Sequence, residues 1–212
     1  MKKTLSFLLF AAALAMPVQA TAQRAWSLRE ATYITKEQID QVNTLPGVDR
    51  QIVSRNIGDL NLSVGIIHRG ALNPAAGGRG GGGRGGAAAA SDCGVTAGEP
   101  SGASGIAHDA QTETYVIWSG EGTLVTGGSI LNGRKSADDS NVTTVLNGPS
   151  CSGAIVGDVK IIDVKEGDVV IIPAGVPHGW LRIPDHVDYL SVRPDPKRVL
   201  SDAYQNPEVT LR

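Results

Sequence analysis

The chain has 212 residues, of which 19 are Lys or Arg and 21 are Asp or Glu, giving a net charge of −2 at pH 7. This balance, without any run of basic residues, argues against a nucleic-acid partner. Beyond the N-terminal segment, no apolar run approaches the length of a membrane span, so no membrane span is expected.

Residues 1–20, MKKTLSFLLFAAALAMPVQA, have the pattern of a signal peptide. Two lysines precede an apolar segment from Leu5 to Met16, and a small-residue cleavage site ends at Ala20. An uncleaved anchor or a buried N-terminal helix is the alternative. The pattern predicts export, with the mature protein periplasmic or secreted.

The next segment, residues 21–72, is expected to contain one helix and two strands. Thr35 precedes KEQIDQVN, with Gln38 three residues on, which is the pattern of a capping box. The predicted helix ends near Pro46, and apolar residues predict strands at 51–57 and 62–69. Residues 73–92 are rich in Gly and predict a mobile loop.

From Ile106 onward, short strand patterns recur at regular spacing with few helix signals between them. Expected strands lie at 114–119, 122–127, 141–146, 159–164, 168–173, 178–183 and 187–193. This spacing is typical of an all-β sandwich or barrel, expected over residues 93–195. The tail comprises residues 196–212, and the stretch DPKRVLSDAY at its start is expected to form a short terminal helix.

The chain has two cysteines, Cys93 and Cys151. An exported chain enters an oxidising compartment, where two cysteines usually pair. We therefore expect a disulfide, with two free buried thiols as the alternative. Neither cysteine has a close cysteine or histidine neighbour in the sequence, which argues against a metal role.

Two stretches contain residues that can bind a metal ion. In HDAQTETYVIWSGEG, His108 is followed by Glu113, and Tyr115 shares a strand face with Glu113. In GDVVIIPAGVPHGW, the break at Pro173 places His178 where the chain re-enters the sheet. Imidazole and carboxylate groups are suitable ligands for a divalent first-row metal.

The spacing of these residues resembles the paired motifs of the cupin superfamily. The second motif is a glycine, five residues, Pro-x-Gly, two residues and His, and it is matched at Gly167, Pro173, Gly175 and His178. The first motif is matched at its second histidine, its glutamate and its last glycine by His108, Glu113 and Gly120. Ile106 stands where the first histidine of that motif should be, and Arg182 stands where an Asn often follows the second motif. The resemblance covers residues 100–195. The stretch TETYVIWSGEGTLVTGG also resembles a subgroup of exported bacterial single-domain cupins.

The resemblance implies a cupin-like antiparallel β-barrel, also described as a double-stranded β-helix or jelly roll. It also implies that His108, Glu113 and His178 bind one divalent ion, either Fe, Mn, Ni or Zn. Gln111 and His68 are candidates either for a fourth metal ligand or for contact with a substrate. The alternative is a cupin that has lost its metal together with the histidine at position 106.

Three further residues are candidates for roles around the metal. Tyr115 is either a core aromatic residue or a catalytic base activated by the nearby cation. Trp180 and Arg182 are candidate substrate-binding residues, with Arg182 able to pair with a carboxylate. Trp118 is an odd number of residues from Glu113, so regular alternation directs it away from the metal.

These observations leave three classes of function open. The preferred one is a metal-dependent enzyme acting on a small organic molecule, with an oxygenase favoured because two histidines and a carboxylate leave positions for substrate and O₂. A metal-dependent lyase or isomerase using Tyr115 as base is the alternative enzyme. The other classes are a non-catalytic protein that binds a small ligand and a structural cupin, which could pair as a homodimer through barrel edges.

Overall fold

The computed structural model describes residues 30–73 and 91–210. The elements, in chain order, are α1 (Lys36–Asn43), β1 (Asp49–Asn56), β2 (Asn61–Leu72), β3 (Pro100–His108), β4 (Glu113–Lys135), the π-helix η2 (Val142–Leu146), β5 (Ser150–Lys165), β6 (Val169–Ile172) and β7 (His178–Asp195). The expected signal peptide and most of the expected Gly-rich loop lie outside the described residues.

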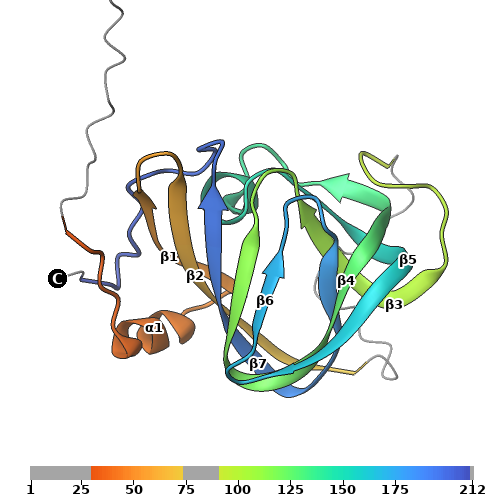
Figure 1. The fold of residues 1–212 in the computed structure, drawn as a ribbon, viewed down its shortest axis with the longest axis horizontal. Helices are drawn as coiled ribbons and strands as arrows, with labels where there is room; N and C mark the ends of the chain where they lie inside the picture. The colour runs from red at the N-terminus through yellow and green to blue at the C-terminus, as the bar shows by residue number, and fades with distance from the viewer. Residues whose placement is uncertain (1–29, 74–90, 211–212) are drawn as a thin grey trace, which may run out of the picture.

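The strands of the described residues form one antiparallel barrel (Figure 1). Their order is β1-β2-β7-β3-β5-β4-β6, and an additional pairing of β7 with β4 closes the sheet on itself. β1, β2 and β6 belong to one face, β3 and β5 to the other, and the long strands β4 and β7 contribute to both. The prediction of an all-β antiparallel barrel with a short N-terminal helix is confirmed.

The strands β4 and β7 are each longer than expected. β4 joins the two strands predicted at 114–119 and 122–127, and β7 joins those predicted at 178–183 and 187–193. Register shifts near Gly120 and Thr123 bend the paired strands where a break was expected. The barrel interior is filled by a buried apolar cluster: Ile67, Tyr115, Ile117, Leu124, Val164, Ile172, Trp180, Ile183, Val187 and Tyr189.

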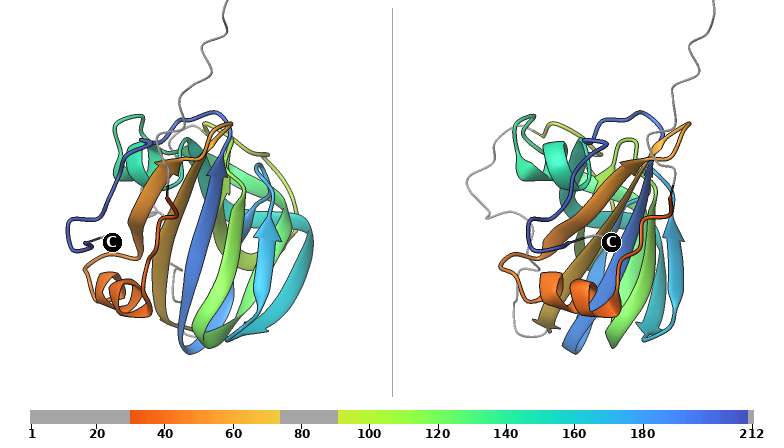
Figure 2. Two further views of the ribbon diagram at one scale, coloured as in Figure 1. Left: turned by 60° about the vertical axis from the view of Figure 1, so that its left-hand side comes forward. Right: turned by 90° about the vertical axis from the view of Figure 1, so that its left-hand side faces the viewer.

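The helix α1 lies against the outside of the barrel, beside β1 and β2 (Figure 2). Its capping box is present, since the Thr35 side chain accepts from the Gln38 backbone N–H and the Gln38 side chain accepts from the Thr35 N–H. Ile39 and Val42 are its buried residues and pack in a second apolar cluster with residues of β1 and β2. The predicted helix is therefore confirmed.

The strand expected at 141–146 is wrong, because these residues form η2. The β-branched residues in NVTTVL suggested a strand, but hydroxyl groups bond to the local backbone instead. The Thr143 hydroxyl donates to the Ala137 carbonyl over 2.8 Å, and the Thr144 hydroxyl donates to the Ser140 carbonyl over 2.9 Å. These bonds stabilise a helical turn over the barrel strands.

The helix expected near the C-terminus is also wrong. Residues 196–205 form turns, bends and a single bridge between Val53 and Gln205. The segment bonds to other elements: the Asp195 carboxylate accepts from the Leu200 N–H over 2.8 Å, and the Asn206 side chain donates to the Gln51 carbonyl over 3.0 Å. These long-range bonds replace the bonds of a helix.

Strand β3 was not predicted, because its sequence PSGASGIAH has few residues that favour strands. It forms between β5 and β7, where the backbones approach closely. A Cβ atom at Gly105 would lie 2.1 Å from the carbonyl oxygen of His178, so only glycine fits there.

A disulfide joins Cys93 to Cys151, as predicted. It connects the segment before β3 to the start of β5, across a sequence separation of 58 residues. Within the described ranges, no helix is both long and apolar enough to cross a membrane.

Removal of the disulfide should lower the free energy of unfolding. For a closed loop of this length the chain-entropy model gives about 4 kcal/mol. We expect Cys93→Ala/Cys151→Ala to show a loss of that order in urea unfolding, and dithiothreitol to lower the stability of the wild type but not of the variant. Equal stability of the two proteins without reductant would contradict this expectation.

Candidate metal centre

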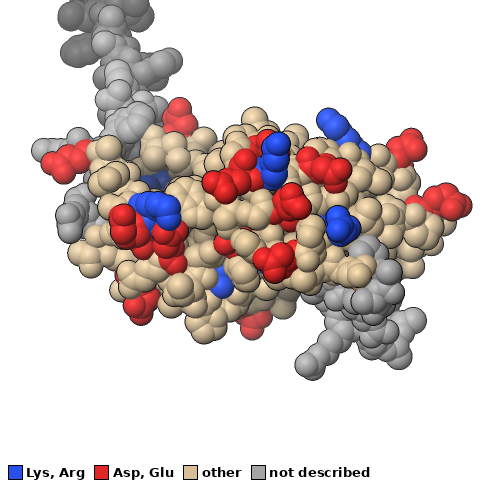
Figure 3. Space-filling view, turned by 90° about the horizontal axis from the view of Figure 1, so that it is seen from below, with Lys and Arg blue, Asp and Glu red and all other residues tan. Residues whose placement is uncertain are grey.

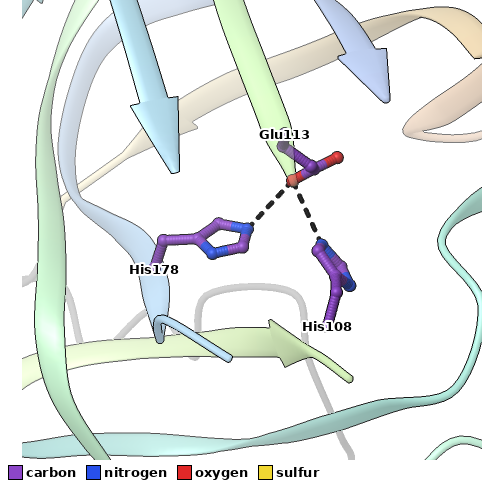
Figure 4. A group of neighbouring side chains, drawn as sticks. All are labelled: His108, Glu113 and His178. Carbon is purple, nitrogen blue, oxygen red and sulfur yellow. Dashed lines mark hydrogen bonds and ion pairs between the residues drawn. The ribbon is translucent and has the colours of Figure 1, made fainter. Parts of the chain in front are cut away.

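Three side chains from three strands meet inside the barrel (Figure 4). His108 ends β3, Glu113 begins β4 and His178 begins β7. Their exposed fractions are only 2%, 1% and 3%. One potential ligand atom from each lies within 4.8 Å of the other two, and among the described residues this is the group of histidine, cysteine and acidic side chains that could hold a metal ion.

Turn geometry brings the two histidines together. Gly175, in the turn between β6 and β7, has φ +79° and donates its N–H to the His108 carbonyl over 2.7 Å. This bond ties the turn before His178 to the end of β3. The ring centroids of His108 and His178 are then 5.1 Å apart. The sequence pattern Pro-Ala-Gly before His178 thus has a direct structural role.

Hydrogen bonds orient the imidazole ring of His108. The Ser150 hydroxyl donates to the Gly148 carbonyl over 2.9 Å, so its oxygen is left to accept from His108 Nδ1, which lies 2.8 Å away. The Asn147 side-chain nitrogen donates to His108 Nε2 over 3.1 Å. With the proton on Nδ1, the lone pair of Nε2 is available to a metal ion, the arrangement that a metal ligand requires. In the other tautomer, Nε2 donates to Glu113 Oε2, which lies 3.1 Å away.

The same logic applies to His178. Its Nδ1 lies 3.0 Å from the Val176 carbonyl, which can only accept, so Nδ1 carries the proton. Its Nε2 lies 3.0 Å from Glu113 Oε2, but this approach lacks the geometry of a hydrogen bond, and Nε2 is buried without a hydrogen-bond partner. A buried lone pair without a partner is costly and marks a place for a cation.

The two carboxylate oxygens of Glu113 have different neighbours. Oε1 accepts from the Ser191 hydroxyl over 2.8 Å and from Arg193 Nε over 2.7 Å. Oε2 accepts from the Tyr115 hydroxyl over 2.9 Å and faces both histidine Nε2 atoms. Oε1 therefore bonds to Ser191 and Arg193, whereas Oε2 bonds to Tyr115 and points toward the two histidines.

Arg193 is fully buried and connects the cluster to the N-terminal strands. Its Nη2 lies 2.5 Å from Asp49 Oδ2, and its Nη1 donates to the Gln51 side chain and to the Leu146 carbonyl, each over 3.2 Å. The guanidinium thus bonds to groups from β1, β4 and the end of η2. Burying this charge is tolerable only because it is paired and hydrogen-bonded.

The electrostatic environment keeps the carboxylate ionised. Burial alone would raise the pKa of Glu113, but the charge of Arg193 holds that pKa well below its usual range. Burial lowers the pKa of His108, which leaves its imidazole neutral near pH 7. Glu113 Oε2 therefore faces the Nε2 atoms of both histidines. When each Nε2 carries a lone pair, the three atoms repel one another unless a cation lies between them.

This donor set fits a divalent metal. First-row ions bind imidazole nitrogen and carboxylate oxygen at about 2.0–2.2 Å, and two histidines with one carboxylate are a known combination for such ions. His108, Glu113 and His178 would hold the ion. Ser150 and the Val176 carbonyl would orient the two imidazoles, as outer partners of metal-binding histidines usually do.

Tyr115 is buried beside Glu113 as alternation predicted. Burial and the Glu113 charge raise the pKa of Tyr115 well above its usual range, so its hydroxyl keeps its proton and donates to the carboxylate. In this arrangement Tyr115 positions Glu113. Its role as a catalytic base stays a prediction.

The two candidate fourth ligands differ in position. His68 does not join the cluster; its Nδ1 lies 2.6 Å from Asp188, and its ring stacks on His186. These residues line a groove of about 1060 Å³ between α1 and the outside of the barrel. Gln111 is buried, with its amide nitrogen donating to Asp195 over 3.1 Å and its Oε1 without a hydrogen-bond partner.

The aromatic and basic residues near His178 also separate. Trp180 is buried in the barrel core, where its Nε1 donates to the Tyr189 hydroxyl over 3.3 Å. Arg182 is exposed. Substrate binding by either residue stays a prediction. Trp118 points outward as expected and donates to Asp40 of α1 over 3.1 Å.

Sequence reasoning missed the residues that surround the ligands: Asp49, Asn147, Ser150, Ser191 and Arg193. One signal could have found Arg193. Tyr189, Ser191 and Arg193 alternate along β7, so an interior Tyr189 places Arg193 in the interior as well. A buried arginine requires a buried carboxylate. No local pattern marks Asn147 or Ser150.

Comparisons with known proteins give similarities of fold at low identity. No protein-family model matches the chain, and no curated protein matches it. Among solved structures, protein BH2720 from Bacillus halodurans is 13% identical with a TM-score of 0.36, covering 84% of this chain and 86% of that one. An RmlC-like cupin family protein with a double-stranded β-helix fold (mj0764) from Methanocaldococcus jannaschii is 11% identical with a TM-score of 0.34, covering 81% and 96%. Oxalate oxidase in complex with glycolate is 12% identical with a TM-score of 0.32, covering 72% of this chain and 54% of that chain.

Removal of Arg193 should strongly destabilise the protein. Arg193→Leu leaves the buried carboxylate of Glu113 and the partly buried carboxylate of Asp49 without their cation, and breaking a buried ion pair this way costs about 3–5 kcal/mol. Urea unfolding of wild type and variant measures the difference. The exposed Arg182→Leu is the matched control and should change stability by less than about 0.5 kcal/mol. Similar small effects for both variants would contradict the role given to Arg193.

Proposed function

We propose that this protein is an exported member of the cupin superfamily that binds one divalent metal ion through His108, Glu113 and His178. The observation that carries the proposal is the convergence of the Nε2 atoms of two imidazoles on one carboxylate oxygen in a buried site. The cupin-like spacing of these residues in the sequence supports it independently.

The set of donors is compatible with Fe, Mn, Ni or Zn. Such an ion, when bound, supplies a Lewis acid with open positions for the oxygen atoms of a substrate or for O₂. The chain's own residues orient the ligands and exclude bulk water from them, since all three ligand side chains are buried. Tyr115 and Arg193 hold the carboxylate in one orientation.

We further propose that the protein is an enzyme acting on a small organic molecule, with an oxygenase as the preferred class. Two histidines and one carboxylate leave coordination positions for both substrate and O₂. The buried, water-excluding site suits a small substrate rather than a polymer. In the alternative lyase or isomerase, Tyr115 would have to lose the proton that it now donates to Glu113.

The remaining parts of the proposal concern location and partners. The disulfide supports export, because disulfides persist in oxidising compartments. A small-molecule partner agrees with the mixed charges on the face in Figure 3, where acidic and basic side chains are interspersed. The homodimer stays a prediction.

The metal proposal predicts about one first-row metal ion per chain in protein purified without chelator, lost in His178→Ala. Elemental analysis of the full mature chain measures this content. His68→Ala is the control, because this histidine lies outside the cluster and its loss should leave the metal content unchanged. If neither wild type nor reconstituted protein holds metal, the protein is a metal-free binding or structural cupin instead.

The enzyme proposal predicts oxygen consumption by metal-loaded protein with one member of a panel of small organic acids, phenols and polyols. An oxygen electrode measures the rate, which should fall at least about 100-fold in Glu113→Gln. Turnover that persists without oxygen and disappears in Tyr115→Phe would instead identify the lyase or isomerase. Saturable binding without turnover would identify a binding protein.

A further inference from the structure

We propose that the side-chain carbonyl of Asn147 is a fourth protein ligand of this metal site. It would take the place of the imidazole that the cupin-like motif lacks at Ile106. The inference rests on the proposed metal-binding function and concerns a residue that no motif in the sequence marks.

The first observation is a distance. The side-chain amide of Asn147 lies 3.1 Å from His108 Nε2, the lone-pair atom that faces the cluster. Glu113 Oε2 lies 3.1 Å from that same nitrogen and 3.0 Å from His178 Nε2. Ligand atoms bound at right angles about 2.1 Å from one ion are about 3.0 Å apart. The Asn147 amide therefore has the same spacing from His108 Nε2 as Glu113, a member of the proposed donor set.

The second observation is that the backbone around Asn147 is fixed by the residues that orient the ligands. The carbonyl before it, on Leu146, accepts from Arg193, which also bonds to Glu113. The carbonyl after it, on Gly148, accepts from Ser150, which also bonds to His108. Its own N–H donates to the Val142 carbonyl over 2.8 Å at the end of η2. Asn147 is thus held over the cluster before any ion binds.

The third observation concerns the freedom of the amide. Within the described part of the chain, the bond to His108 is the one hydrogen bond that the Asn147 amide makes. An Asn side chain carries a donating NH₂ group and an accepting carbonyl oxygen, which exchange places on a half-turn about the Cβ–Cγ bond. When His108 Nε2 presents a lone pair and no ion is bound, the NH₂ group of Asn147 faces that nitrogen. When an ion is bound to His108 Nε2, the carbonyl oxygen of Asn147 faces the ion.

The position at which a histidine is missing agrees with this assignment. Ile106 pairs with His178 across the β3–β7 ladder and is two residues from His108, so all three side chains share the interior face. An isoleucine there supplies no donor. The η2 segment, whose end carries Asn147, supplies an oxygen from a different part of the chain.

Gln111 is the rival amide. Its buried Oε1 has no hydrogen-bond partner, which is also a mark of a ligand atom. However, its nitrogen is tied to Asp195, and its side chain lies against Gly148, where a Cβ atom would be 2.5 Å from Oε1. A half-turn of the Gln111 amide, unlike that of the Asn147 amide, would break its hydrogen bond to Asp195.

The test is Co²⁺ binding by the full mature protein after chelator treatment. Affinity is measured by competition with a chelating dye, and the visible d–d spectrum reports the number and kind of ligands. We expect Asn147→Ala to weaken binding at least about tenfold and to change the spectrum. Asn147→Asp keeps an oxygen and should retain tight binding. Asn141→Ala, at the exposed start of η2, is the matched control.

A gain-of-function variant completes the test. Ile106→His in the Asn147→Ala background should restore affinity and give a spectrum with an additional nitrogen ligand. Wild-type affinity and spectrum in Asn147→Ala, or a loss confined to Gln111→Ala, would overturn the assignment of Asn147 while leaving the metal site intact. If the wild type itself binds no Co²⁺, the proposed metal function fails first. Near-UV circular dichroism of each variant separates loss of a ligand from loss of folding.

Discussion

The buried ion pair between Arg193 and Glu113 is the interaction on which the candidate site depends. An isolated carboxylate inside a barrel would take up a proton and lose its value as a ligand. The guanidinium prevents this by holding the pKa of Glu113 low, and it occupies Oε1 so that Oε2 alone points at the histidines. The ionisation of the carboxylate and its orientation therefore have the same cause.

A second consequence of this ion pair concerns the protonation of His108. With Arg193 already balancing charge, a protonated imidazole beside Glu113 is not needed, and burial disfavours it at His108. The Ser150 hydroxyl and the Val176 carbonyl then place each remaining proton on Nδ1. With both protons on Nδ1, two lone pairs and one anionic oxygen converge, and a divalent cation between them would stabilise that arrangement.

The sequence was most informative where short-range physics decides the structure. The capping box at Thr35 is a local signal, and the motif spacing of His108, Glu113 and His178 reflects turns that need glycine and proline. Patterns failed where distant partners decide. The strand β3 depends on the backbones of β5 and β7, and η2 depends on hydroxyl bonds that outweigh the strand preference of its residues. The surroundings of the ligands belong to this second kind, because Asp49 and Arg193 are far apart in the sequence.

The N-terminal strands therefore belong to the site rather than to a separate accessory layer. Asp49 on β1 pairs with Nη2 of Arg193, whose guanidinium keeps Glu113 ionised and orients it. Gln51 on the same strand accepts a hydrogen bond from Nη1 of that guanidinium. A cupin-like motif alone supplies the ligands but not this counterion framework. The described fold can hold an ionised carboxylate in its dry interior because the guanidinium of Arg193 lies beside it, and Asp49 and Gln51 of β1 bond to the other nitrogens of that guanidinium and hold it in place. The same guanidinium fixes Leu146 beside Asn147, so the framework that sets the charge of the site also sets the position of its fourth candidate ligand.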